Sequence, residues 1–258
     1  MKHAALWRLV VVASAALAIE FACRIGMIDR LTMVPPSQMV IALVKMSGAP
    51  WFWSDAGSTF RNTCAAIVLS IVPGFLIGLF VHALPRLRRV LNPVLLSYYS
   101  VPTFVFYPLL IVVFGIGPGS LIVMGAMFGI VAMISATLAA IDRIPRVYSK
   151  VARVTRLSPW QTALRIKLPA ATPHLITGIK LAVAYSVIGV IAGEFIIATA
   201  GLGRRLTLAY NGFDTATMYG LIVLILIAMA VVNSVLQRWE TRIHRIWYGR
   251  RWHRATPE

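Results

Sequence analysis

Acidic residues are scarce in this chain, where eight Asp and Glu stand against 25 Lys and Arg in 258 residues. Charged residues make up only 13% of the chain, 59% are hydrophobic, and the mean hydropathy is +0.80. Such a composition excludes a soluble globular domain. Cysteine is also rare. Cys23 and Cys64 lie in or beside apolar segments, which argues against a disulfide framework or a zinc site and predicts small core residues.

Signatures of catalysis and of nucleotide binding are missing as well. The five histidines show no H-x-x-x-H or H-E-x-x-H spacing, and the chain contains neither G-x-S-x-G nor G-x-x-x-x-G-K-[ST]. The glycine-rich run 115–119 follows no strand, so we interpret it as a tight external turn. We therefore expect no catalytic, metal or cofactor-binding residues, and any ATP and Mg must be bound by a partner chain.

Long apolar runs dominate what remains. A bilayer core about 30 Å thick needs roughly 20 mainly apolar residues per spanning helix. Six runs qualify, and they predict an all-α, polytopic membrane helical bundle that forms a single domain over residues 1–258. The expected spans are 6–28, 59–81, 95–114, 121–141, 175–198 and 218–236. The first run could instead be a signal peptide, since residues 16–18 resemble a cleavage site. Its apolar character continues to Ile28, and Glu20 and Arg24 can pair on one helix face, which favours a retained helix.

The placement of the basic residues predicts the orientation. The net charge of +17 could indicate nucleic-acid binding, but the charges lie between apolar runs. Most of the Lys and Arg fall before the first expected span, between the second and third, between the fourth and fifth, and after the sixth. By the positive-inside rule, both termini are cytoplasmic. We expect attraction to anionic membrane lipid and no nucleic-acid partner.

The connection 29–57 is the longest external one. It holds Pro35-Pro36, an apolar stretch at Met39–Met46, and the aromatic cluster Trp51-Phe52-Trp53. We expect a short interfacial helix followed by an aromatic anchor at the membrane surface.

The cytoplasmic loop 142–174 has a structure of its own. A short helix is expected from Arg146 to Leu157. Ser158, Pro159 and Gln161 then form a capping-box pattern for a second helix. Pro169 is expected to end that helix, and Thr172-Pro173 to start the fifth span. The loop's apolar positions can pack on the bundle, on a partner or on the lipid surface, and they include Val147, Val151, Val154, Leu157, Trp160 and Leu164.

At this loop the chain resembles the permease subunits of type I ABC importers. Their mark is E-A-A-x-x-x-G followed by I-x-L-P; Ala152 matches the second alanine, and residues 166–169 (Ile-Lys-Leu-Pro) match the ending. Residues 101–117 and the run Gly193-Glu194-Phe195 with Gly201-Leu202-Gly203 resemble the nitrate/sulfonate/taurine branch. The resemblance covers about Pro35 to Arg242.

The resemblance implies that the loop docks on an ATPase and couples its closure to transport. The matching residues are Lys150, Val151, Ala152, Arg153, Arg156, Leu157, Ser158, Pro159, Gln161, Leu168 and Pro169. Lys150 stands where the motif has its acid, and Arg156 where it has glycine. The chain could be one half of a heterodimeric permease, or its ATPase could carry a compensating acidic surface.

Polar residues inside the expected spans are candidates for the translocation path. Glu194 is the acid of the fifth span; it could line the path or make a buried helix-to-helix hydrogen bond, for instance to Tyr107. The other path candidates are Tyr98, Tyr107, Tyr185 and Ser186.

The resemblance also implies the assembly and its location. The partners would be two ABC ATPase subunits, a second permease copy or a homologous permease, and a periplasmic or surface solute-binding protein, in the cytoplasmic (inner) membrane of a prokaryote. The solute would be small, either an organic anion or nitrate- or sulfonate-like. The main alternative is an ATP-independent carrier or channel. A membrane-embedded enzyme is a second alternative, which the sequence favours less.

Overall fold

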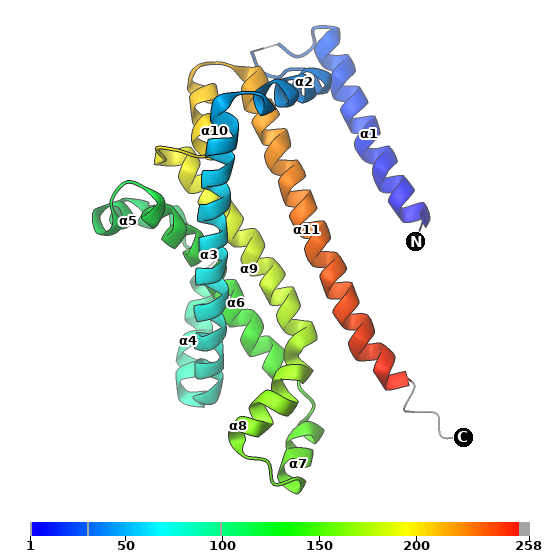
Figure 1. Ribbon diagram of the computed structural model, residues 1–258, viewed down its shortest axis with the longest axis vertical. Helices are drawn as coiled ribbons and strands as arrows, with labels where there is room; N and C mark the ends of the chain where they lie inside the picture. The colour runs from blue at the N-terminus through cyan, green and yellow to red at the C-terminus, as the bar shows by residue number, and fades with distance from the viewer. Residues whose placement is uncertain (1, 30, 99, 253–258) are drawn as a thin grey trace. The chain divides into compact units, whose positions relative to one another are not determined.

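The computed structural model describes residues 2–29, 31–98 and 100–252 and consists there of helices and connecting turns (Figure 1). The helices are α1 (Lys2–Arg24), α2 (Pro36–Ser47), α3 (Pro50–Ala83), α4 (Pro85–Tyr98), the 3₁₀ helix η1 (Thr103–Phe106), α5 (Tyr107–Phe114), α6 (Pro118–Asp142), α7 (Arg146–Val154), α8 (Pro159–Thr162), the π-helix η2 (Ala163–Lys167), α9 (Leu168–Ile197), α10 (Leu202–Asn211) and α11 (Thr215–Trp252). The all-α expectation is confirmed.

Four helices in the described part of the chain are long and apolar enough to cross a membrane: Pro50–Ala83, Pro118–Asp142, Arg165–Ile196 and Thr215–Ile243. They contain most or all of the second, fourth, fifth and sixth expected spans. Helix α1 covers most of the first expected span and has 23 residues, but it is not among these four. The chain is thus a multi-pass protein, with four such helices among its described residues, or five if the bent pair Pro85–Tyr98 and Thr103–Phe114 counts as one span. The first expected span, 6–28, stays a prediction.

The expected third span, 95–114, is not one straight helix. The chain turns between α4 and the segment Thr103–Phe114, and the two directions differ by 97°. Pro102 lies at this break, and its ring both removes a backbone N–H and disfavours helical geometry at the residue before it. The apolar run 95–114 is therefore interrupted by a bend at Pro102.

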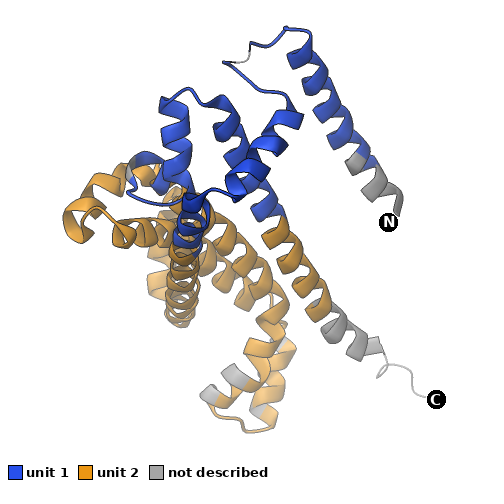
Figure 2. Cartoon of the chain, turned by 45° about the horizontal axis from the view of Figure 1, so that its top comes forward, with its two compact units in different colours: residues 1–60, 194–230 blue, residues 61–193, 231–258 orange. Residues whose placement is uncertain are grey.

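The residues pack as two compact units, shown in Figure 2: residues 1–60 with 194–230, and residues 61–193 with 231–258. In the first unit, Met46 of α2, Phe52 of α3 and Leu221 of α11 form a buried cluster. Gly220 permits this contact, because a Cβ there would lie 2.6 Å from the Met46 Cε atom. The expected short helix in the external connection is present as α2.

The second unit is held together by close helix packing through small residues. A Cβ on Gly189 of α9 would lie 2.8 Å from the Gly125 Cα of α6, and a Cβ on Gly125 would lie 2.9 Å from the Ala66 Cβ of α3. Small residues let helices approach closely, which replaces the hydrophobic driving force that lipid does not provide. The three helices α3, α6 and α9 therefore form the tight centre of this unit.

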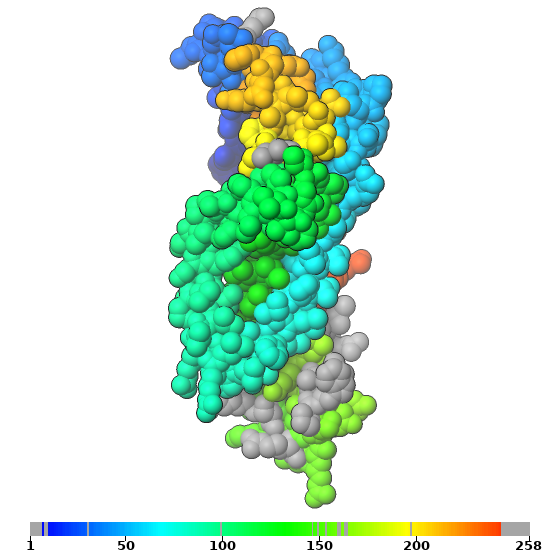
Figure 3. Space-filling model, turned by 90° about the vertical axis from the view of Figure 1, so that its left-hand side faces the viewer, coloured from blue at the N-terminus to red at the C-terminus, as the bar shows by residue number. Residues whose placement is uncertain are grey.

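Large apolar side chains are exposed on α4 and α5 of the second unit, which face the viewer in Figure 3. Val90, Leu96, Leu109 and Val112 are all more than half exposed. Such a surface suits contact with lipid acyl chains or with another apolar protein surface, as in a membrane-embedded chain.

Candidate functional site

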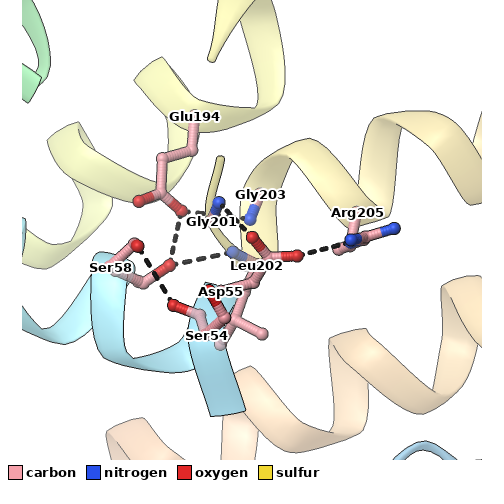
Figure 4. Close-up of polar contacts among 9 residues, drawn as sticks. Ser54, Asp55, Ser58, Glu194, Gly201, Leu202, Gly203 and Arg205 are labelled. Carbon is pink, nitrogen blue, oxygen red and sulfur yellow. Dashed lines mark hydrogen bonds and ion pairs between the residues drawn. The ribbon is translucent and has the colours of Figure 1, made fainter. Parts of the chain in front are cut away.

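Glu194, the acid of the fifth expected span, lies at the centre of a polar cluster in the first unit (Figure 4). Its side chain is fully buried near the end of α9. The Thr59 hydroxyl of α3 donates to Glu194 Oε2 at 2.7 Å, and the Gly203 N–H of α10 donates to the same oxygen at 3.1 Å. One carboxylate thus connects three helices.

Two residues one turn apart on α3 complete the cluster. The Leu202 N–H donates to the Thr59 hydroxyl at 2.8 Å, and the Gly201 N–H donates to Asp55 Oδ1 at 3.1 Å. The other Asp55 oxygen pairs with the guanidinium of Arg205. The first N–H groups of a helix lack intrahelical partners and favour negative charge. Three consecutive N–H groups at the start of α10 therefore each have a side-chain acceptor.

Gly201 is required by this arrangement for two reasons. Its φ of 112° lies in the region that L side chains rarely adopt. A Cβ built on it would also collide with the Glu194 carboxylate. The Gly-Leu-Gly run that carries part of the family resemblance thus has a physical cause: Gly201 gives the carboxylate room, and the Gly203 N–H binds it.

These contacts favour the second of the two interpretations of Glu194, a buried hydrogen bond between helices, with Thr59 as a partner. Asp55 lies in the expected external connection 29–57 and Thr59 is the first residue of the second expected span, so neither was among the candidate site residues. A usable signal existed, since residues four apart share a helix face and both carry an oxygen acceptor beside an apolar run.

The other path candidates lie in the second unit. Ser186 of α9 is fully buried, with its hydroxyl 3.0 Å from that of Ser70 on α3. The Tyr98 hydroxyl donates to the Met127 carbonyl at 3.1 Å, Tyr107 is buried, and Tyr185 is half-buried. Ser186 and Tyr107 therefore pack inside the unit in this conformation, and a role on the path stays a prediction.

The first helix of the 142–174 loop ends in a Schellman motif. Helix α7 stops at Val154, and the Leu157 N–H donates to the Ala152 carbonyl at 3.1 Å, the bond that closes this motif. Arg156 occupies the position that glycine usually takes and has a φ of 49°. The glycine of the resembling motif thus coincides with a left-handed backbone position, which here carries an arginine.

The predicted capping box is present at the start of α8. The Gln161 N–H donates to Ser158 Oγ at 3.2 Å, and the Ser158 N–H donates to Gln161 Oε1 at 3.1 Å. The side chains of two predicted coupling residues, Arg153 and Pro159, lie outside the described residues, as does that of Trp160. The Schellman motif at the end of α7 and the capping box at the start of α8 together define the turn between these two helices.

The expected helix stop at Pro169 and the expected new start at Thr172-Pro173 are both wrong. The chain stays helical from Pro159 through η2 into α9, and Pro169, the second residue of α9, directly follows the π-helical turn η2. The Thr172 hydroxyl donates to the Leu168 carbonyl at 3.0 Å, one turn back, and does not cap a helix start. Leu168 and Pro169 are half-buried here.

Asp142, the last residue of α6, anchors the base of the loop. Arg88 of α4 binds both of its carboxylate oxygens, with Nη1 2.8 Å from Oδ1. His82 Nδ1 of α3 lies 3.7 Å from the same Oδ1. The ion pair between Arg88 and Asp142 thus joins the ends of α4 and α6, and His82 at the end of α3 lies beside it. Across the described residues, no three His, Cys, Asp or Glu side chains form a metal-binding group.

Comparison with known proteins gives a family match over most of the chain. The sequence profile of the family described as "Binding-protein-dependent transport system inner membrane component" matches residues 66–245. The chain is 26% identical over 230 residues to the taurine transport system permease protein TauC of Escherichia coli K12, covering 86% of this chain and 82% of that one. It is 24% identical over 185 residues to the nitrate import permease protein NrtB of Leptolyngbya laminosa, covering 72% and 66%.

Solved structures give the same fold. A chain from an inward-facing structure of the MetNI methionine ABC transporter superposes with a TM-score of 0.66 at 20% sequence identity, covering 82% of this chain and 99% of that chain. This likeness concerns the helical architecture and carries no residue roles.

Proposed function

Because the chain belongs to the binding-protein-dependent transport system inner membrane component family, we propose that it is the permease subunit of an ATP-driven importer. It would form the path for a small solute that an external binding protein delivers. The observation that supports this most is the family match over residues 66–245, together with spanning helices in the same part of the chain. Hydrolysis would belong to a partner chain.

Residues 142–174 are proposed as the coupling loop within a single transmembrane domain, 1–258. The rigid elbow made by the Schellman motif and the capping box supports this, because a rigid element transmits displacement to the helices it adjoins. Both termini and this loop would be cytoplasmic. ATP-driven closure of two ATPases would then shift the permease between two states that they bind differently.

The proposed solute is small and anionic, organic or nitrate- or sulfonate-like. Two of the relatives, a taurine permease and a nitrate permease, support this class. Selectivity would rest largely with the binding protein. Tyr98, Tyr107, Tyr185 and Ser186 remain candidates for the path, while the contacts of Glu194 support a structural role.

The proposal is tested by isolating the tagged chain gently from its native membrane and identifying its stoichiometric partners by mass. We expect a Walker-motif ATPase and either a second copy or a homologous permease. The purified complex is then reconstituted into vesicles with the binding protein, and uptake of taurine, other sulfonates and nitrate is measured with and without ATP. An ATPase variant lacking its Walker lysine is the control. Uptake that does not need nucleotide would instead support the carrier or channel alternative.

A further inference from the structure

The last described turns of helix α11 have one face that is largely exposed. Val231 and Val235 are 57% and 58% exposed, and Trp239, one turn further along, is 44% exposed. Arg238 and Arg242 are exposed as well, and the spacings of four, three and four residues place them on the same side of the helix as the valines. An apolar surface on this face is thus followed directly by an indole and two positive charges.

The acidic residue of this segment does not neutralise the two arginines. Glu240 stands two residues from each of them, on the opposite side of α11, and there it binds α9. Lys180 donates to its Oε2 at 2.7 Å, and the Thr177 hydroxyl donates to its Oε1 at 3.0 Å. Among the described residues, neither Arg238 nor Arg242 makes an ion pair. Both guanidiniums are therefore available to an anionic ligand.

A cavity of about 560 Å³ lies beside this face. The described residues that line it are Val235, Arg238, Trp239, Thr241 and Arg242. Its volume is within the range of about 300–1,000 Å³ that is usual for small-molecule sites. The Thr241 hydroxyl donates to the Arg238 carbonyl at 2.9 Å, so the donors left for a ligand are the guanidiniums and the indole N–H. Guanidinium groups bind phosphate oxygens through paired hydrogen bonds, which makes a phosphate the matching anion.

The order of these groups along the helix favours a lipid over a soluble anion or a soluble protein. The segment Thr215–Ile243 is long and apolar enough to cross a membrane, and roughly 20 residues counted from its start reach about Val235. The valines then lie at the depth of the acyl chains, and Trp239 lies at the membrane interface, where tryptophan is enriched. The arginines beyond it reach the level of the phosphates. A phospholipid presents its acyl chains and its phosphate in this same order.

We propose that this face of α11 binds one anionic phospholipid, whose phosphate is held by Arg238 and Arg242 and whose acyl chain lies along Val231 and Val235. The inference goes beyond the proposed function, because it depends neither on the solute nor on the ATPase. In the proposed orientation the lipid belongs to the cytoplasmic leaflet, whose surface is negative. A general attraction of positive charge to the membrane would treat all exposed arginine pairs alike, whereas a site makes this pair different from the others.

The test measures the dissociation constant of the first phosphatidylglycerol bound to the purified, delipidated chain in detergent, by native mass spectrometry. The double variant Arg238→Gln with Arg242→Gln is expected to weaken this binding by about tenfold or more. The matched control is Arg86→Gln with Arg89→Gln, two exposed arginines of α4 outside the cavity, and its binding is expected to stay within about twofold of the parent value. Phosphatidylcholine is expected to bind the parent chain more weakly, because its choline cation opposes the guanidiniums.

Two further variants separate charge from geometry and from folding. Arg238→Lys with Arg242→Lys keeps both charges but removes the paired donors, so an intermediate loss is expected. Because both arginines are exposed, thermal unfolding without lipid is expected to be the same in all these variants and in the parent chain. A loss of phosphatidylglycerol binding that is confined to the α11 variants would support the site.

Three results would overturn the proposal. Equal losses in the α11 and α4 double variants would show a general attraction of charge and no site. Displacement of the lipid by inorganic phosphate would show that the cavity recognises the free anion, and displacement by the ATPase recovered with the chain would show that this face is a protein contact. Uptake with and without ATP tests the importer function separately, so the lipid site can fail while that function stands.

Discussion

Replacing Glu194 separates a structural role from a role on the translocation path. In Glu194→Ala, the Thr59 hydroxyl and the Gly203 N–H lose their shared acceptor at 2.7 and 3.1 Å. Hydrogen bonds to charged groups contribute about 1.5–3 kcal/mol each, and removing the buried carboxylate returns part of this by relieving its desolvation. We therefore expect the start of α10 to be destabilised by about 2–4 kcal/mol.

Glu194→Gln is the matched variant. Its amide oxygen can still accept from both donors, so we expect a loss of under about 1 kcal/mol. The assay is hydrogen exchange of peptides covering Gly201–Gly203 in the purified complex. Because about 1.4 kcal/mol corresponds to a factor of ten, Glu194→Ala should accelerate local opening by roughly 30-fold to 1,000-fold.

The two interpretations of Glu194 give opposite patterns. If the carboxylate holds α10, exchange at its start rises in Glu194→Ala and stays near the parent value in Glu194→Gln. If the charge serves the path, both variants lose uptake alike while exchange is unchanged. Equal acceleration of exchange in the two variants would refute the reasoning, because an acceptor retained by glutamine would then make no difference.

Three further substitutions test the local geometry. Gly201→Ala should destabilise the first unit by at least about 2 kcal/mol, because its φ is 112° and the added Cβ would collide with the Glu194 carboxylate. Gly57→Ala is the control and should be neutral or stabilising, because a Cβ at Gly57 meets nothing within 4 Å. Thermal unfolding of the two purified variants compares them. Arg156→Gly should stabilise the α7–α8 turn by about 1 kcal/mol, read as slower hydrogen exchange there, and unchanged or faster exchange would contradict the left-handed assignment. Ser158→Ala should cost about 1 kcal/mol at the start of α8, and exchange of the Gln161 amide would rise accordingly; no rise would show that the capping box contributes nothing.

Much of the helical organisation followed from local signals. Residues 121–141 and 218–236 form long helices because an uninterrupted apolar run in a membrane must satisfy its backbone internally. The capping box at Ser158 and Gln161 was also predictable, since both bonds join residues three apart. The predictions based on proline were the ones that failed, at Pro169 and at Thr172-Pro173. The sequence does not say whether Pro169 ends a helix or lies inside one, because a change of helix type in the preceding turn, here η2, can accommodate the N–H that proline lacks.

The candidate site also combines features that local sequence predicts with contacts that it does not. The sequence by itself determined the class of protein, the apolar helices and the loop between the fourth and fifth expected spans, since these depend on composition and on residues a few positions apart. Only the tertiary structure decided that Asp55, Thr59 and Glu194 meet at the start of α10, and that the basic face of α11 is exposed. Asp55 and Thr59 bind groups more than 130 residues away, and such contacts depend on how helices pack in space rather than on any local pattern.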